Sequence, residues 1–529
     1  MMRGEAGDPA GFGLTVGSAF LAAAARVPSR VAISFEGREL TYAEVRRDSG
    51  RLAAALLGWL GCRHGDRVGV LLPNCPEFLL AVLGIARAGL VAVPLPAAAT
   101  AREVRHLVED SGLRVLLTGP AAADRLGDEL PDLARAGVAF RDAGGLVESA
   151  TGDVADLGRE DQPFFIGYTS GTTGRPKGAV VGHRARTLLA LLHGQEYGCY
   201  TPGEHHLIAT PMYHGAGLSR ALAPLISGAS LDLQRGFDPE RVVREIAAGQ
   251  VTATFMVPAM FASILDLPAA VLDVGPGRLR TVLSNASALP EHLKLRILDR
   301  WPGVRLFEIY GSTEAGTVTS LRPEDQLRKQ RCVGLPLPLT EVRIAGEAGA
   351  DAAPGEIGVL RVRSPFLFSG YHGDRRATDE VMRDGHLTTG DLARLDEEGY
   401  VYIVGRVSDV VITGGVNVYP REVEEYLAEL AGVREAVVLG LPHPRWGETV
   451  HAVIVPQPGG PRPSVVELLA HCRRGLAPAK IPRGFSFEEA LPLTASGKVA
   501  RKQLAERLQR SAQEGDGHMR QAGRTDARI

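Results

Sequence analysis

Short apolar segments with the character of buried strands alternate with amphipathic segments through the first part of the chain. Residues 65–72 read as a turn and a buried strand, 78–88 as a helix and 90–94 as the next strand. Thr41, followed by Glu44 three residues later, has the spacing of a capping box, which predicts the start of a long amphipathic helix. Because two strands joined by a single helix run parallel in one sheet, the sequence predicts an α/β fold.

The alternation continues well beyond these first elements. Further buried strands are expected at residues 115–117, 206–209, 253–257 and 281–283. Residues 356–404 change to short β-segments separated by glycine and aspartate, which predicts a small β-rich subdomain. Since 529 residues exceed what one hydrophobic core usually holds, two or more domains are expected.

The composition argues against several classes of protein. Hydrophobic residues make up 45% and charged residues 23% of the chain, and the net charge of −2 gives no field that favours nucleic acid or an anionic membrane. The five cysteines are odd in number and form no C-x-x-C pair, which argues against a disulfide framework or a zinc knuckle. The sequence shows no signal-peptide pattern and no apolar run long enough to span a membrane, so a cytoplasmic protein is expected.

Residues 168–179, Tyr-Thr-Ser-Gly-Thr-Thr-Gly-Arg-Pro-Lys-Gly-Ala, form the most informative motif for function and are expected to make one short turn. Gly171, Gly174 and Gly178 can adopt backbone angles closed to other residues, so that successive N–H groups converge on an anion. Lys177 adds positive charge, but a glycine follows it instead of the serine or threonine of a P-loop, which indicates a different nucleotide fold. Without that context, a Ser-Gly-Thr-Thr-Gly segment is more often a flexible surface loop.

At nearly every position this motif resembles the signature loop of the AMP-forming superfamily of acyl-CoA synthetases, adenylation domains and luciferases, and the resemblance extends from about residue 40 to residue 504. It implies a large N-terminal domain of parallel α/β sheets with a β-rich subdomain, and a small, mobile α+β C-terminal domain. The expected segments are a disordered start (1–13), the N-terminal domain (14–405), a hinge (406–409), the C-terminal domain (410–508) and a disordered tail (509–529). The resemblance also implies that the loop binds ATP through Thr169, Ser170, Gly171, Thr172, Thr173, Gly174 and Lys177.

A second block, Tyr310-Gly311-Ser312-Thr313-Glu314, follows an apolar strand at residues 304–307, and strand ends in open α/β sheets are where ligand groups lie. Alone the block is a weak signal, since a glutamate in this position is usually a solvated charge. By the resemblance, Tyr310 stacks on adenine beside Gly311, Thr313 bonds phosphate and Glu314 binds the magnesium ion that neutralises the triphosphate.

A third block places Asp391 in a predicted tight turn, Thr389-Gly390-Asp391, with Arg406 fifteen residues later. A carboxylate in such a turn either accepts hydrogen bonds from a ribose or caps its own backbone. The resemblance favours the ribose for Asp391 and counts Arg406 among the nucleotide ligands.

The C-terminal blocks concern the two chemical steps. Lys498, at the end of Pro-Leu-Thr-Ala-Ser-Gly-Lys, resembles the family's catalytic lysine, which bridges the substrate carboxylate and the α-phosphate. Gly415 corresponds to a glycine that leaves room for the thiol arm of CoA. Ser408 stands where aspartate or lysine is usual at the hinge, so the domain motion is expected but its rate is left open.

The acid site is expected around His214, which would gate or orient the substrate. Small residues follow it, and no aspartate is placed to hold an α-ammonium group, so an apolar chain or ring is expected instead of acetate or an amino acid; the small residues are Gly215, Ala216, Gly217, Ser219 and Ala221. In a second wall, Asn285 and Ser287 depart from the small residues usual in the family. They either shorten the acyl tunnel or bond a substrate oxygen.

The resemblance therefore predicts an acid–CoA ligase that uses ATP, Mg²⁺ and CoA. A medium- or long-chain aliphatic acid or an aryl acid would attack the α-phosphorus of ATP, and CoA would then displace AMP to form the thioester. One alternative is an adenylating enzyme that loads the phosphopantetheine of an acyl carrier protein. Another is a degenerate nucleotide- or acyl-binding protein, which the intact residues Lys177, Glu314, Asp391, Arg406 and Lys498 argue against.

Overall fold

The computed structural model describes residues 13–127, 138–169, 176–346, 349–457, 459–492 and 499–510. It divides into two compact units: residues 1–342 with 361–388 form unit 1, and residues 343–360 with 389–529 form unit 2. The domain boundary at residues 405 and 406, with its hinge, stays a prediction. The ends expected to be disordered lie outside the described residues, except for residue 13 and for residues 509 and 510, which end a helix.

Unit 1 contains a nine-stranded sheet in the order β15-β14-β13-β12-β11-β9-β10-β1-β2. Its strands are β1 Val31–Phe35, β2 Arg38–Thr41, β9 His205–Ile208, β10 Ser230–Leu233, β11 Ala253–Met256, β12 Thr281–Ser284, β13 Arg305–Ser312, β14 Gly316–Leu321 and β15 Leu335–Pro336. The strands from β1 through β13 that follow crossover helices pair in parallel, whereas β1–β2 and β13–β14 are antiparallel hairpins.

A seven-stranded sheet in the order β18-β8-β7-β4-β3-β5-β6 is the second sheet of unit 1. Its strands are β3 Arg67–Leu71, β4 Val91–Pro94, β5 Val115–Thr118, β6 Ala139–Asp142, β7 Pro163–Thr169, β8 Lys177–Gly182 and β18 Gly370–Tyr371. The predicted strand–helix–strand unit is confirmed, because β3 and β4 are parallel and α3, Pro76–Arg87, connects them. Both sheets are thus parallel at their centres and antiparallel at hairpins.

The helices of unit 1 cover these sheets. They are α1 Val16–Arg26, α2 Tyr42–Gly58, α3, α4 Ala101–Ser111, α5 Pro120–Leu126, α7 Ala143–Ser149, α8 His183–Tyr197, α9 Gly215–Ser227, α10 Pro239–Ala247, α11 Pro258–Leu265, α12 Ala269–Leu272, α13 Glu291–Arg300 and α14 Arg375–Val381. The capping box that predicts α2 is present, since the Thr41 side chain accepts from the Glu44 N–H and the Glu44 carboxylate accepts from the Thr41 N–H at 2.7 Å.

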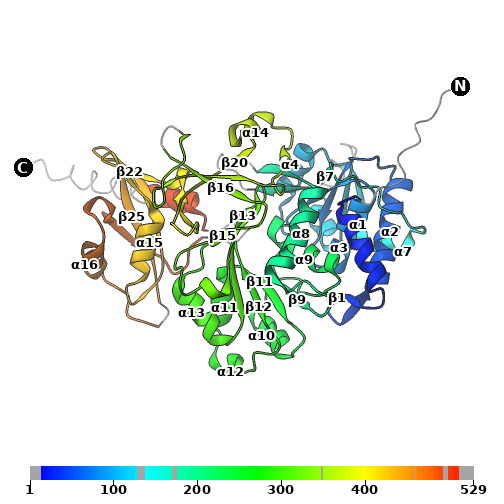
Figure 1. Ribbon diagram of the computed structural model, residues 1–529, viewed down its shortest axis with the longest axis horizontal. Helices are drawn as coiled ribbons and strands as arrows, with labels where there is room; N and C mark the ends of the chain where they lie inside the picture. The colour runs from blue at the N-terminus through cyan, green and yellow to red at the C-terminus, as the bar shows by residue number, and fades with distance from the viewer. Residues whose placement is uncertain are drawn as a thin grey trace, which may run out of the picture. The chain divides into compact units, whose positions relative to one another are not determined.

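Helices α8 and α9 pack against each other (Figure 1). Helix α8 contacts both large sheets of unit 1: the Arg186 guanidinium lies 4.9 Å from the ring centre of Phe165 in β7, and the His193 ring bonds Thr317 in β14 at 3.0 Å. Helices α10, α11 and α13 bury an apolar core on the opposite face of the nine-stranded sheet. Helix α8 is therefore placed between the two sheets, beside the strands that carry the predicted nucleotide motifs.

A smaller sheet, in the order β16-β17-β20-β19 with β21 paired to β20, contains the segment predicted to be β-rich. Its strands are β16 Glu341–Ala345, β17 Gly358–Arg363, β19 Met382–Arg383, β20 His386–Leu395 and β21 Val401–Arg406. The residue boundary between the two units falls within these strands.

Unit 2 has its own apolar core. The strands around it follow the order β23-β22-β25-β24 with β26 paired to β25, and they are β22 Val411–Thr413, β23 Val416–Val418, β24 Val433–His443, β25 Gly447–Pro456 and β26 Gly484–Phe487. Helices α15, Pro420–Ala428, and α16, Val465–Gly475, complete the unit and confirm its α+β character. Among the helices described, none is long and apolar enough to cross a membrane. All five cysteines are buried and unbridged.

Candidate active site

The glycine-rich motif connects two antiparallel strands of unit 1. Thr169 ends β7, Lys177 begins β8, and these two residues pair across the hairpin. The prediction of one short turn over residues 168–179 was therefore wrong for its ends, which are strands. Gly178 also lies in β8, where a methyl group built on it would come within 2.7 Å of the Ile166 side chain, so close packing and not an unusual backbone angle accounts for this glycine. Five predicted ATP ligands, Ser170, Gly171, Thr172, Thr173 and Gly174, lie outside the described residues.

The Glu314 carboxylate lies beside the two ends of this hairpin. Its Oε1 accepts hydrogen bonds from Thr169 Oγ1 at 3.4 Å and from Tyr371 Oη at 3.1 Å. The Lys177 ammonium nitrogen lies 5.2 Å from the centre of the Tyr371 ring. The structure thus brings together three predicted site residues, Thr169, Lys177 and Glu314, around one tyrosine.

Tyr371 lies among these predicted site residues, and sequence reasoning missed it. It reaches the site because the short strand β18 pairs with β8, where Tyr371 lies opposite Ala179. Burial raises the pKa of the Tyr371 hydroxyl, and the neighbouring Glu314 carboxylate raises it further, so the hydroxyl keeps its proton and donates to Glu314. Its only sequence signal was the Gly-Tyr pair at the end of an irregular stretch, which names no partner.

Thr313 lies between strand β7 and the first turn of α9. A methyl group built on Gly215 would lie 3.2 Å from Thr313 Oγ1, and one built on Gly167 would lie 3.0 Å from Thr313 Cγ2. His214 is the N-cap residue of α9, and its ring centre is 4.2 Å from that of Tyr213. The predicted acid-site residue His214 and the predicted phosphate ligand Thr313 are therefore close together, since Gly215, which follows His214, adjoins Thr313.

Tyr310 and Gly311 are part of a strand and do not follow one. Strand β13 continues through Ser312, and Tyr310 pairs with Thr319 while Gly311 pairs with Thr317 in β14. The expected strand end at residue 307 was wrong because β14 supplies hydrogen bonds that no apolar pattern signals. A methyl group on Gly311 would come within 2.1 Å of the Gly316 carbonyl oxygen, so only glycine fits at this register shift.

Asp391 and Arg406 are neighbours within unit 2. They pair across strands β20 and β21, and Arg406 Nε lies 3.1 Å from Asp391 Oδ1. The predicted tight turn at Asp391 is wrong, since the residue lies inside β20 and is buried. The carboxylate therefore bonds a guanidinium that is itself about half exposed, at 48%.

Gly415 lies at the tip of a two-residue hairpin between β22 and β23. The φ angles of Gly414 and Gly415 are 58° and 81°, as a type I′ turn requires at both central positions. A methyl group on Gly415 would meet nothing within 4 Å, whereas one on Gly414 would lie 2.8 Å from the Trp446 ring. At the predicted hinge, Ser408 Oγ donates to Asp409 Oδ1 at 2.9 Å. Lys498 lies outside the described residues.

The second predicted acid wall follows β12. Asn285 Oδ1 accepts from the Ala286 N–H at 2.5 Å, and Ala286 has a φ of 78°, which is uncommon for a residue other than glycine. The Asn285 side-chain oxygen therefore stabilises this strained turn.

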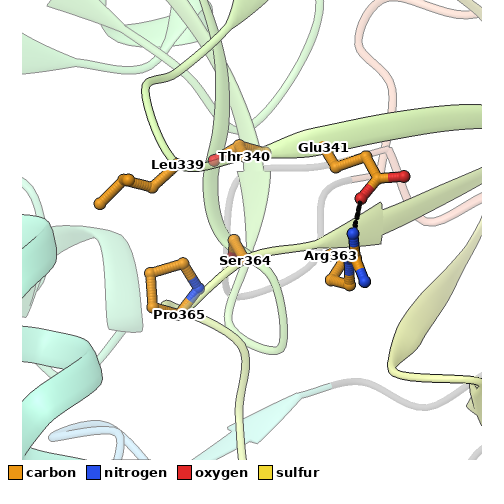
Figure 2. A pocket seen from close by; sticks show the side chains of 6 residues that line it. All are labelled: Leu339, Thr340, Glu341, Arg363, Ser364 and Pro365. Carbon is orange, nitrogen blue, oxygen red and sulfur yellow. Dashed lines mark hydrogen bonds and ion pairs between the residues drawn. The ribbon is translucent and has the colours of Figure 1, made fainter.

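Two of the cavities formed by described residues lie in unit 1 and are shallow. One of about 470 Å³ includes Tyr371 in its lining, together with Val180, Ser369, Gly370, Gly373, Asp374, Arg375 and Thr378. Figure 2 shows the other, of about 450 Å³, lined by Leu339, Thr340, Glu341, Arg363, Ser364 and Pro365. In that cavity Arg363 Nε donates to Glu341 at 2.8 Å (Figure 2). None of the predicted site residues lines it.

Comparison with known proteins matches almost the whole chain. The family model described as AMP-binding enzyme matches residues 20–372, and the one described as AMP-binding enzyme C-terminal domain matches residues 422–498. A feruloyl-CoA synthase from Amycolatopsis sp is 37% identical over 91% of this chain and 96% of its own. A fatty acid–[acyl-carrier-protein] ligase, ScoC, from Streptomyces coeruleorubidus is 33% identical over 91% of this chain and 94% of its own.

Solved structures agree with these matches. ATP-bound MatB from Rhodopseudomonas palustris superposes with a TM-score of 0.86 at 30% identity, covering 94% of this chain and 99% of that one. The o-succinylbenzoate CoA synthetase of Bacillus subtilis, in complex with ATP and a magnesium ion, has a TM-score of 0.82 at 31% identity, covering 92% of this chain and 98% of that one.

Proposed function

Since the chain belongs to the family of AMP-binding enzymes, we propose that the side chains around Thr313 and Glu314 bind the phosphates of ATP. The enzyme is an AMP-forming acid–CoA ligase, which converts a carboxylic acid to acyl-AMP with ATP and then forms the thioester with CoA. The observation that carries the site assignment is the Glu314 carboxylate, held by Thr169 and Tyr371 beside Lys177 where the glycine-rich hairpin begins. Catalysis then rests on positioning and on charge stabilisation.

The donor set fits a magnesium ion that arrives with the nucleotide. The two hydrogen bonds that described side chains donate to the Glu314 carboxylate both go to Oε1, so Oε2 is the oxygen suited to a cation. Magnesium usually takes one or two carboxylates together with substrate phosphates, and the described residues contain no cluster of three or more metal-ligating side chains. When bound, the ion would neutralise phosphate charge and let the anionic carboxylate approach the α-phosphorus.

We assign the nucleotide contacts of unit 2 to Asp391 and Arg406. A carboxylate that pairs with a guanidinium at 3.1 Å has a fixed orientation, which suits it to accept a hydrogen bond from a ribose hydroxyl. Lys498 is assigned to the acid carboxylate and the α-phosphate, and Gly415 to the path of the CoA arm. His214 is assigned to the entrance of the acid site, since it caps the helix whose first residue borders Thr313.

The acid is a medium- or long-chain aliphatic acid or an aryl acid in this proposal. The first turn of α9 offers small side chains, Gly215 and Ala216, which are partly exposed and leave room next to Thr313. A panel of such acids in a pyrophosphate-release assay, with and without CoA, tests the assignment. If the enzyme forms acyl-AMP but no thioester when CoA is supplied, a carrier protein is favoured as the acceptor. The name of the ScoC relative gives a carrier protein as the acceptor for that enzyme. Absence of pyrophosphate release with every acid would favour a degenerate binding protein.

Glu314→Gln is expected to weaken the dependence of turnover on magnesium while leaving folding intact. Glutamine keeps the size of the side chain and can still accept from Thr169 and Tyr371, but it lacks the charge that holds a divalent cation. A magnesium titration of pyrophosphate release measures the effect, with Glu324→Gln, at an exposed position of the following 3₁₀ turn, as the control. An unchanged titration and an unchanged rate would remove Glu314 from the site.

Asp391→Ala is expected to raise the KM for ATP roughly 10- to 100-fold, because a hydrogen bond to a charged group contributes about 1.5–3 kcal/mol. Deoxyribose analogues should then be used almost as well as ATP. Glu397→Ala, at the exposed turn of the same β20–β21 hairpin, is the matched control. If the Asp391 variant still discriminates against deoxyribose as the wild type does, the ribose contact lies elsewhere.

A further inference from the structure

Four lysine and arginine side chains are buried in the described part of the chain: Arg87, Arg186, Arg220 and Lys294 are 0%, 5%, 3% and 1% exposed. Two of them have carboxylate partners, since Arg87 pairs with Asp153 at 2.5 Å and Lys294 with Glu308 at 2.7 Å. Arg186 and Arg220 form no ion pair with a carboxylate among the described residues. These two arginines lie on the packed helices α8 and α9 of unit 1.

Arg220 is held in place by neutral groups. Its Nη1 donates to Nδ1 of His193 at 3.2 Å and to the Tyr200 hydroxyl at 3.4 Å, and its guanidinium lies 5.2 Å from the Tyr197 ring centre and 5.5 Å from that of Phe255. Aromatic faces and neutral acceptors fix the orientation of a guanidinium but do not neutralise its charge.

His193 extends this arrangement and is itself uncharged. Burial and the neighbouring guanidiniums hold the pKa of His193 well below its usual range. Since Nδ1 accepts from Arg220, Nε2 carries the proton and donates to Thr317 Oγ1 at 3.0 Å. Thr317 lies opposite Gly311, a predicted nucleotide-site residue, in the β13–β14 pair, so the hydrogen bonds from Arg220 end beside the predicted site.

Arg186 adds a second positive charge to the same region. Its guanidinium stacks on the Phe165 ring at 4.9 Å. Burial lowers the pKa of Arg186 to about 10, and repulsion by Arg220 contributes to the same shift, yet the group stays charged at neutral pH. Two like charges that repel each other inside a domain are costly unless an anion or strong acceptor joins them.

Several polar atoms of this cluster lack hydrogen-bond partners within the described residues. They are Arg186 Nε, Ser219 Oγ and Arg220 Nε, all of them buried. A buried donor without an acceptor destabilises the folded protein. The cluster therefore offers donors and positive charge and lacks the acceptor that would balance them.

Two elements, helix α9 and strand β7, connect the cluster to the proposed acid site. Along α9, Gly215 adjoins Thr313 and Arg220 follows five residues later, about 7.5 Å further at the helical rise. Ala216, partly exposed, lies one turn before Arg220 on the same face of the helix. Along β7, a methyl group built on Gly167 would lie 2.9 Å from the Phe165 ring and 3.0 Å from Thr313 Cγ2, so Phe165 and Thr313 are close neighbours. The Arg186 guanidinium stacks on this same Phe165 ring.

We propose that Arg186 and Arg220 bind a second acceptor oxygen on the acid substrate, remote from the carboxylate that is activated. The inference rests on the proposed function and narrows it: the acid is compact and carries a carboxylate, phenol or ketone oxygen at its far end, and a plain alkyl chain does not fit. Arg220, supported by His193, is the main specificity-determining residue because it lies on α9, the helix whose first residue, Gly215, adjoins Thr313. An acid lacking the oxygen leaves the buried donors unpaired, which sites of this kind reject strongly.

The first test uses the wild-type enzyme and three acids of similar size, 4-methylcinnamate, 4-hydroxycinnamate and 4-carboxycinnamate, with octanoate and suberate as an open-chain pair. Among the cinnamates, the better of the hydroxy and carboxy acids is expected to have a kcat/KM for pyrophosphate release roughly 100-fold or more above that of 4-methylcinnamate. Suberate is expected to exceed octanoate by a similar factor. Preference for 4-carboxycinnamate and suberate identifies an anionic group, and preference for 4-hydroxycinnamate alone a neutral one. Use of the methyl-ended acids as efficiently as all the others would overturn the inference and leave the ligase function standing. Release with no acid at all would overturn the function itself.

Arg220→Met is the second test, because methionine fills much of the volume without charge or donors. The preference for oxygen-bearing acids should fall at least roughly tenfold while turnover of the methyl-ended acid is kept or rises. Arg235→Met, which removes a surface guanidinium stacked on Phe35 at 5.0 Å, is the matched control. Equal loss for all acids in a folded Arg220→Met protein would contradict the proposal. If that variant does not fold, calorimetric binding of acyl-sulfamoyl-adenosine analogues of the same acids to the wild type gives the same comparison, and equal dissociation constants would overturn the proposal.

Discussion

Lys498→Ala is expected to lower the rate of acyl-AMP formation roughly 10²–10³-fold, as the loss of one preorganised donor does in other active sites. The reason is electrostatic: the acid carboxylate and the α-phosphate repel each other, and the lysine charge is needed where they meet. Thioester formation from synthetic acyl-AMP should survive, because the anionic repulsion is absent from the second step. The two half-reactions are measured separately, by pyrophosphate release and by thioester formation from supplied acyl-AMP and CoA.

The matched control for Lys498 is Lys502→Ala, since Lys502 is an exposed lysine of the helix that follows. That variant should keep both rates. Equal losses in both half-reactions of the Lys498 variant would contradict its assignment to acyl-AMP formation, because the loss of a purely structural lysine would slow both steps alike. The C-terminal segment would then stabilise the fold without taking part in the chemistry.

Local sequence signals predicted the elements that local interactions stabilise. The capping box of Thr41 and Glu44 lies within one turn of α2, and the apolar residues 68–71 are buried in β3. The parallel order of β3 and β4 followed from the short helix between them. These features required no knowledge of distant parts of the chain.

The errors share one physical cause, which is strand pairing with partners that are remote in sequence or carry no apolar pattern. Thr169 and Asp391 were expected in turns and Tyr310 just after a strand, yet each lies in a strand that pairs with a neighbouring strand. Tyr371 was missed because the pairing of β18 with β8 brings it to Glu314. Arg220 was overlooked because the small residues around it in α9 indicated an apolar wall.

Gly415→Leu is expected to slow thioester formation roughly 10²-fold or more while leaving acyl-AMP formation nearly intact. A bulky side chain at the tip of the β22–β23 hairpin would misplace the arm of CoA, and small errors of position cost rates of this size. A Cβ atom built on Gly415 meets no described atom within 4 Å, so a side chain there starts into open space. The variant should therefore accumulate acyl-AMP and still exchange pyrophosphate into ATP.

The backbone of the hairpin sets the control for this experiment. Gly415 has a φ of 81°, so leucine there adds strain of about 1–3 kcal/mol whatever its role. Gly37, in the turn between β1 and β2, has a φ of 82° and equally open surroundings, so Gly37→Leu carries the same strain without the proposed contact to CoA. If both variants lose the same amount of thermal stability and only the Gly415 variant loses thioester formation, Gly415 lies on the path of the CoA arm. A blocked CoA path would leave acyl-AMP formation, and with it pyrophosphate exchange, intact. Loss of pyrophosphate exchange in a folded Gly415→Leu protein would therefore mean that the glycine is needed for the geometry of the turn and not for CoA.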